Sequence, residues 1–102
     1  MKLKTILASA IIFVSGSAAA AIPTHEYDIY ANQVGKVQYC LQIGEISTEL
    51  AREHIRASIN MLGRRGDTVD TDRLYAGATK RKEMFLKTYG KTDRGNLCFN
   101  IN

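Results

Sequence analysis

The chain contains two cysteines, Cys40 and Cys98, and the second lies close to the C-terminus of the sequence. With two cysteines, only one intramolecular disulfide is possible. In the chain-entropy model a bridge over this separation stabilises a protein by about 4 kcal/mol, a large share of the total for a small domain. The residues around Cys98, "NLCFNI", are largely apolar, although free chain ends tend to be polar. We therefore expect a disulfide between Cys40 and Cys98 that fixes the C-terminal tail.

Residues 1–21 have the three-part order of a secretory signal peptide. A basic start is followed by an apolar run over residues 6–14 and then by small residues. Ala19 and Ala21 satisfy the A-x-A rule, so cleavage is expected after Ala21 or one residue earlier. The alternative is an uncleaved membrane anchor, because the uncharged stretch 5–21 is at the lower edge of the length needed to cross a bilayer.

Cleavage would leave residues 22–102 as a single exported helical domain. We expect this domain in the periplasm if the source is a Gram-negative bacterium, and secreted otherwise. An exported protein meets an oxidising environment, where paired cysteines are usually structural. A reactive or redox-active thiol is the alternative, but neither cysteine belongs to a C-x-x-C motif. The sequence therefore favours a structural disulfide.

Three stretches with apolar residues at helical spacing predict an all-α fold, a small three-helix bundle with its tail held by the disulfide. A short final turn in the tail would make it a four-helix bundle. The first expected helix covers residues 25–43, with Thr24 as its cap and Gly44 at its end. The second covers residues 48–62, between Ser47 and Gly63, and the third covers residues 71–89, between Asp70 or Thr71 and Gly90.

The second expected helix, residues 48–62, is apolar over more than half of its circumference. Such a helix is normally packed between two neighbours, so we expect it to be the central helix of the fold. Its polar residues collect on one narrow arc. On that arc, Glu49 with Arg52 and Glu53 with Arg56 place opposite charges three residues apart, which is typical of a solvated outer face.

Candidate catalytic and metal-binding residues do not form any established motif. His54 lacks the second histidine that a metallopeptidase helix needs, because position 58 is Ser58. Asp67, Asp70 and Asp72 do not fit the spacing of a calcium-binding EF-hand loop and are expected to cap the following helix. The chain also lacks a G-x-S-x-G motif and a glycine-rich phosphate loop. The sequence therefore predicts no catalytic residue, no metal and no cofactor.

The basic residues give a slightly stronger signal. The formal net charge is +4, but Lys2 and Lys4 belong to the expected signal peptide, which leaves +2 for residues 22–102. This mild charge and the export signal argue against nucleic acid as a partner.

The third expected helix carries its basic residues in line. We call the following residues the basic stripe: Arg73, Lys80 and Lys87, extended by Lys91 and Arg94. Such a stripe is usually a solvated helix face. The alternative is a surface that binds anionic envelope components or an acidic protein.

The size and plan of the chain are similar to those of several kinds of small periplasmic protein. Among these are immunity proteins against secreted toxins, acid-stress chaperones and secretion-system accessory proteins. The resemblance covers the architecture alone, because no motif here is specific to any of these groups. We expect a non-enzymatic protein of the bacterial cell envelope that binds another protein. The alternative is a cationic protein that uses the basic stripe on lipid headgroups or polysaccharide.

Overall fold

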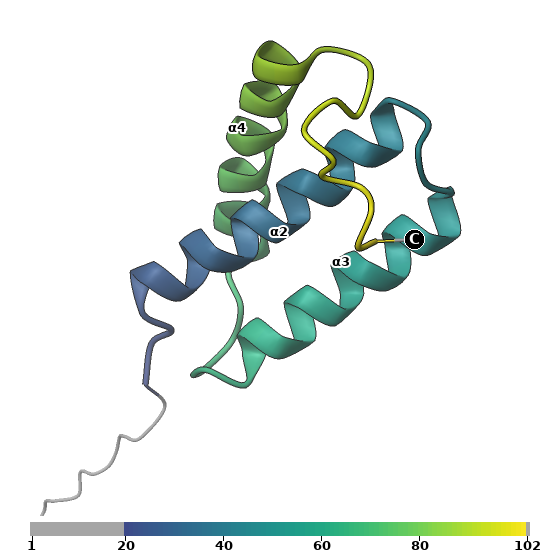
Figure 1. Cartoon of the computed structure of the whole chain (residues 1–102). Helices are drawn as coiled ribbons and strands as arrows, with labels where there is room; N and C mark the ends of the chain where they lie inside the picture. Colours follow the sequence, from purple (N-terminus) through teal and green to yellow (C-terminus); the bar gives the residue numbers. More distant parts are fainter. Residues whose placement is uncertain (1–19, 102) are drawn as a thin grey trace, which may run out of the picture.

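The computed structural model describes residues 20–101, which form three α-helices and no β-strand (Figure 1). The helices are α2 (Thr24–Gln42), α3 (Thr48–Gly63) and α4 (Thr71–Tyr89). The prediction of an all-helical fold is confirmed, and the helix bounds lie within one residue of the expected ones. No fourth helix is present in the described part of the chain. The predicted signal peptide lies outside the described residues, apart from Ala20 and Ala21.

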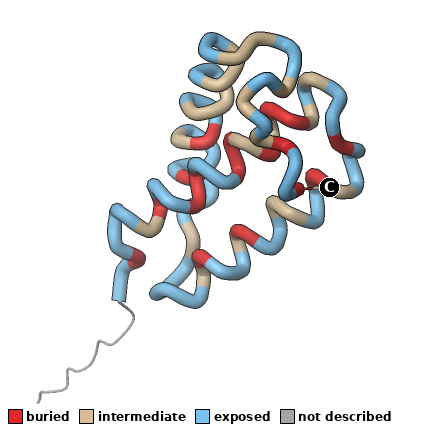
Figure 2. Tube along the Cα trace, viewed as in Figure 1, coloured by how far each residue is buried: buried red, intermediate tan, exposed pale blue. Residues whose placement is uncertain are grey.

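Two clusters of buried residues make up the core. Figure 2 shows that buried positions recur along α2. One cluster joins the first half of α2 to α3 and α4, and the other joins the second half of α2 to α3 and the C-terminal tail. The first consists of Ile22, Tyr27, Tyr30, Ala31, Val34, Leu62, Leu74 and Ala78, and the second of Val37, Tyr39, Cys40, Ile46, Ala51, Cys98 and Ile101.

The central helix is α2. Both α3 and α4 pack against it, α4 more extensively, whereas α3 and α4 hardly contact each other (Figure 1). The prediction that the second helix would be central was therefore wrong. Its wide apolar surface is real, but α2 is the only helix of the described residues that packs extensively against it, and the side towards α4 stays open. Ile55 and Ile59 are half-buried, and Met61 is 46% exposed.

Small residues allow α2 and α4 to approach closely. A Cβ atom at Gly35 of α2 would lie 2.6 Å from the Cβ of Arg81 and 2.7 Å from the carbonyl oxygen of Ala78, both in α4. At a second contact, a Cβ at Gly77 would lie 3.0 Å from the Cβ of Ala31. These distances leave little or no space for a methyl group. The absence of a side chain at Gly35 therefore sets how near the two helices lie.

Replacing Gly35 with alanine is expected to lower the free energy of unfolding by about 1–3 kcal/mol, because the added methyl group would overpack the crossing of α2 and α4. The loss would appear even though alanine favours a helix interior over glycine by about 1 kcal/mol. Chemical denaturation of both proteins measures the difference. Gly63→Ala is the matched control, since its Cβ would meet only Val69, at 3.5 Å. A Gly35→Ala protein as stable as the control would contradict the close crossing.

The helix starts show which capping predictions hold. The Ser47 hydroxyl accepts a hydrogen bond of 3.1 Å from a backbone N–H in the first turn of α3. The Asp70 carboxylate accepts one of 3.2 Å from the backbone N–H of Arg73 in α4. Both predicted N-caps are confirmed. Thr24 was expected to cap α2, but Pro23 occupies the cap position and Thr24 is the first helical residue.

The disulfide between Cys40 and Cys98 is confirmed, and both residues are buried. It ties the tail, residues 90–101, to α2, and the tail ends beside α3 (Figure 1). Polar contacts shape the tail just before the bridge. The Asp93 carboxylate accepts hydrogen bonds from the backbone N–H groups of Leu97, at 2.7 Å, and of Cys98, at 3.0 Å. The apolar residues around Cys98 are thus part of the packed structure.

A buried tyrosine holds the start of the tail. The hydroxyl of Tyr39, in α2, donates to the carbonyl oxygens of Gly90, at 3.0 Å, and Thr92, at 3.1 Å. Burial, with a smaller contribution from the Asp93 carboxylate, raises the pKa of Tyr39 above its ordinary value. The phenol therefore stays protonated at neutral pH and remains a donor to the backbone.

Candidate functional site

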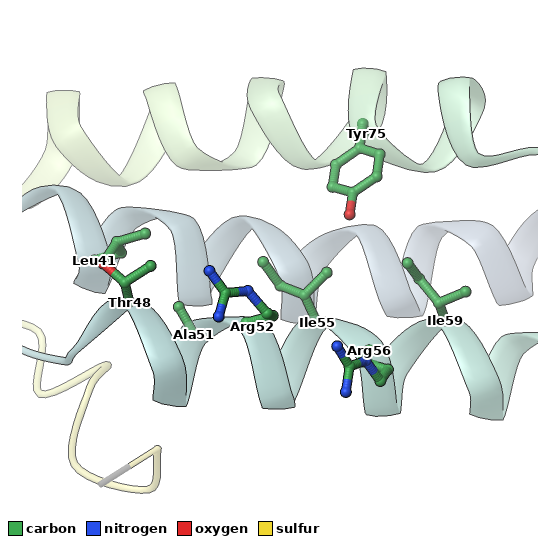
Figure 3. Close-up of a pocket in the computed structure, with 8 residues that line it drawn as sticks. All are labelled: Leu41, Thr48, Ala51, Arg52, Ile55, Arg56, Ile59 and Tyr75. Carbon is green, nitrogen blue, oxygen red and sulfur yellow. The ribbon is translucent and has the colours of Figure 1, made fainter.

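An open groove lies between α3 and α4, over α2 (Figure 3). Its volume is about 400 Å³, and the surface that lines it is mostly apolar. The lining residues are Leu41 of α2, Thr48, Ala51, Arg52, Ile55, Arg56 and Ile59 of α3, and Tyr75 of α4. The groove exists because α3 and α4 both pack against α2 and hardly contact each other.

The apolar residues of the groove belong to a surface of α3 that is only partly covered. Ala51, Ile55 and Ile59 recur at intervals of four residues and therefore lie on one side of the helix. Ile55 and Ile59 pack against the core on one side and line the groove on the other. Tyr75 is 37% exposed and directs its hydroxyl from α4 towards α3 (Figure 3). The result is an apolar bed with an aromatic residue on its far rim.

The near rim of the groove is positively charged. The guanidinium groups of Arg52 and Arg56 lie on the α3 side of the groove (Figure 3). Both residues are exposed, and neither forms an ion pair within the described part of the chain. The expected pairs with Glu49 and Glu53 are not formed, and no carboxylate lines the groove. The two arginines therefore offer hydrogen-bond donors and charge to a molecule that enters the groove.

Two members of the basic stripe take part in the fold. The guanidinium of Arg73 lies 4.4 Å from the centre of the Tyr27 ring and donates a hydrogen bond of 3.0 Å to the Thr24 hydroxyl. The guanidinium of Arg94 donates to two backbone carbonyls at the end of α4, including that of Tyr89 at 2.9 Å. Arg73 thus links α4 to the start of α2, and Arg94 caps the C-terminus of α4.

The other three residues of the basic stripe remain on the surface. Lys80 and Lys87 on α4 and Lys91 in the tail are exposed, and among the described residues none of them forms an ion pair. The structure therefore leaves three of the five predicted residues free to meet a partner.

The residues considered for catalysis or metal binding, or their close neighbours, take part in hydrogen bonds that stabilise the fold. The Ser58 hydroxyl donates a hydrogen bond of 3.0 Å to the backbone carbonyl of His54, one turn earlier in α3. Asp70 caps α4, and the backbone N–H of Asp67 donates to the carbonyl oxygen of Ala20 at 2.8 Å. Within residues 20–101, no group of three His, Cys, Asp or Glu side chains could hold a metal ion.

Comparison with known proteins does not identify a relative: no family model, no curated protein and no solved structure matches the chain. The disulfide points to a non-reducing compartment. None of the helices between residues 20 and 101 is long and apolar enough to cross a membrane.

Sequence reasoning placed the groove residues elsewhere. Ile55 and Ile59 belong to the apolar part of residues 48–62, which was expected to be covered by two neighbouring helices, and Arg52 and Arg56 were assigned to a solvated face. The signal that could have found the groove is the width of the apolar surface on residues 48–62, which is more than one neighbouring helix covers. Which part of that surface stays open depends on the arrangement of the helices.

Proposed function

We propose that this protein is a non-enzymatic, exported protein of the bacterial cell envelope that binds another protein, and that the groove between α3 and α4 is the binding surface. The observation that supports the proposal is the uncovered apolar side of α3, next to two unpaired arginines. Exposed apolar surface that is rimmed by polar residues is one of the features that mark protein–protein contact sites. An immunity or inhibitor protein, a chaperone and a secretion accessory protein would each need such a surface.

The shape of the groove favours a protein segment over a small molecule. Sites for small molecules are concave and enclose about 70–90% of the ligand surface. This groove is open to solvent and follows α3 from Thr48 to Ile59, about three helical turns or roughly 16 Å. An elongated, open, apolar surface of that length suits an element of secondary structure.

Site-specific photo-crosslinking in cells that produce the full chain tests the proposal. A photoreactive amino acid at Tyr75, on the rim of the groove, is expected to crosslink to one envelope protein in high yield. The same amino acid at Lys80, on α4, is the matched control and is expected to give little of that product. Crosslinks to protein from Lys80 but not from Tyr75 would show that the groove is not the binding surface.

The alternative, a cationic protein that binds anionic envelope components, draws on Lys80, Lys87 and Lys91. These three lysines are exposed and unpaired within the described residues. Binding to anionic vesicles that falls steeply with salt, and is lost in Lys80→Glu with Lys87→Glu, would support it. Arg73 and Arg94 keep their charge but direct their guanidinium groups to other parts of the fold, so fewer side chains of the basic stripe can extend to a partner, and we favour the groove.

A further inference from the structure

We propose that the groove binds one amphipathic α-helix of a partner protein, and that this helix carries carboxylates one turn apart which pair with Arg52 and Arg56. The inference rests on the proposed function and names the chemistry of the partner. It is carried by the unpaired arginines on the rim of an apolar bed.

The apolar bed has the period of a helix-binding surface. Ala51, Ile55 and Ile59 follow one side of α3 over two turns, and Leu41 of α2 extends the bed at one end. A helix that packs beside them would place apolar residues at positions i, i+3 or i+4, and i+7 against this row. Packed helices lie about 8–10 Å apart, so such a helix would rest on α3 with Tyr75 of α4 on its other side.

The charge on the rim selects an acidic partner. Arg52 and Arg56 are four residues apart, so their side chains are stacked one turn apart along α3. Carboxylates four residues apart on a second helix have the same separation. Arginine binds a carboxylate through two parallel N–H···O bonds, which gives orientation as well as attraction. No acidic side chain of the protein itself occupies these positions in the described part of the chain.

The N-terminal leader of this chain is a poor occupant of the groove. The sequence contains no acidic residue before Glu26, and Lys2 and Lys4 give the leader a positive charge. The leader would therefore bring like charge towards Arg52 and Arg56 and could not pair with either arginine.

A second copy of the protein also fits less well. Its α3 could offer Glu49 and Glu53, which are spaced four residues apart. However, the residues that follow on that outer surface are Ala57, Asn60 and Met61, so one large apolar side chain is available there and not a ridge that could fill the groove. The partner must combine an apolar ridge with acidic residues beside it.

Two designed helical peptides with the same leucine ridge form the test, one with glutamates and one with lysines at two flanking positions four residues apart. Fluorescence anisotropy measures the binding of each labelled peptide to the purified oxidised protein. The glutamate peptide is expected to bind about tenfold more tightly, because it can form two exposed ion pairs with the arginines, whereas the lysine peptide brings like charges to them. In Arg52→Glu with Arg56→Glu the preference is expected to reverse in favour of the lysine peptide. Both arginines are exposed, so this variant is expected to fold, with a small loss of thermal stability because it places like charges one turn from Glu49 and Glu53. Circular dichroism at the temperature of the binding assay checks that it is folded.

The apolar part of the proposal has its own control. Ile59→Ser is expected to weaken the binding of both peptides, while Lys80→Ser, on α4, is expected to leave the binding of both unchanged. If the two peptides bind equally well and Ile59→Ser abolishes the binding of both, the proposal of an acidic partner is overturned, but protein binding by the groove is still supported. If neither peptide binds but Tyr75 still crosslinks to an envelope protein, only the proposal of a helical partner is overturned. Failure of both peptides and of the crosslink would remove the proposed function as well.

Two further outcomes would assign the groove to a different occupant. Sedimentation that shows a dimer, which Arg52→Glu with Arg56→Glu dissociates, would mean that a second copy fills the groove. Vesicles of acidic phospholipid that bind through Arg52 and Arg56, while the glutamate peptide does not, would mean that a lipid does. Either result would overturn the inference.

Discussion

Removing the disulfide by replacing both Cys40 and Cys98 with alanine is expected to lower the free energy of unfolding by about 4 kcal/mol. The bridge joins residues 58 positions apart, and in the chain-entropy model a long closed loop restricts the unfolded chain strongly. A domain of this size has a total stability of about 5–15 kcal/mol, so the loss would be a large fraction of it. Urea denaturation of the oxidised wild type and the double variant gives the difference.

The matched control for the disulfide is a change beside it that leaves the bridge intact. Phe99 follows Cys98 directly but is 72% exposed, so Phe99→Ala is expected to change the stability by less than about 0.5 kcal/mol. Thiol titration of the native protein without reductant should find no free thiol, as both cysteines are paired. A double variant with the stability of Phe99→Ala would mean that the tail is held by its other contacts, such as those of Asp93.

Features that depend on a few neighbouring residues could be predicted from the sequence. A helix start needs one side-chain oxygen near a free backbone N–H, which Ser47 and Asp70 supply. The end of α4 needs a residue with positive φ, and Gly90 has a φ of 76°. The disulfide was predictable because two cysteines allow one pairing. Thr24 failed as a cap because a residue just outside the helix, Pro23, already holds that position.

The packing of the helices could not be predicted from periodicity. The wide apolar surface of α3 shows that exposing much of this helix to water is unfavourable. It does not show whether a neighbouring helix, a partner protein or solvent covers each side. The sequence also offered no sign that Gly35 has a role in packing, since a glycine inside a helix usually indicates only a lower helix propensity. In the structure its missing side chain is what admits α4, and the close packing of α4 makes α2 the central helix.

The candidate site followed from that packing and was therefore beyond the reach of sequence patterns. Arg52 and Arg56 lie on a polar arc beside acidic residues, which reads as an ordinary solvated surface. Only the open space between α3 and α4 distinguishes them from the surface lysines of the basic stripe. In the same way, sequence spacing placed Arg73 in the basic stripe, whereas its guanidinium lies over the Tyr27 ring.

Replacing Leu74 with alanine is expected to lower the free energy of unfolding by about 2–5 kcal/mol, because the side chain is fully buried between α4 and α2 and its loss would leave a cavity. Leu62, on the α3 side of the same cluster, is also fully buried, and Leu62→Ala should have an effect of similar size. Ile55 is half-buried beside the groove, so Ile55→Ala should cost clearly less than either leucine. Urea denaturation of the three variants ranks the positions.

The neighbouring residue Tyr75 separates stability from binding. It follows Leu74 in α4 but lies on the rim of the groove. Tyr75→Ala is therefore expected to retain most of the stability of the protein while it weakens the binding of the glutamate peptide. Leu74→Ala should do the reverse under conditions in which it is still folded, since its side chain does not line the groove. If Ile55→Ala proved as costly as Leu74→Ala, α3 would be covered on both sides. The groove would then be closed in solution, and both the central position of α2 and the proposed binding surface would be wrong.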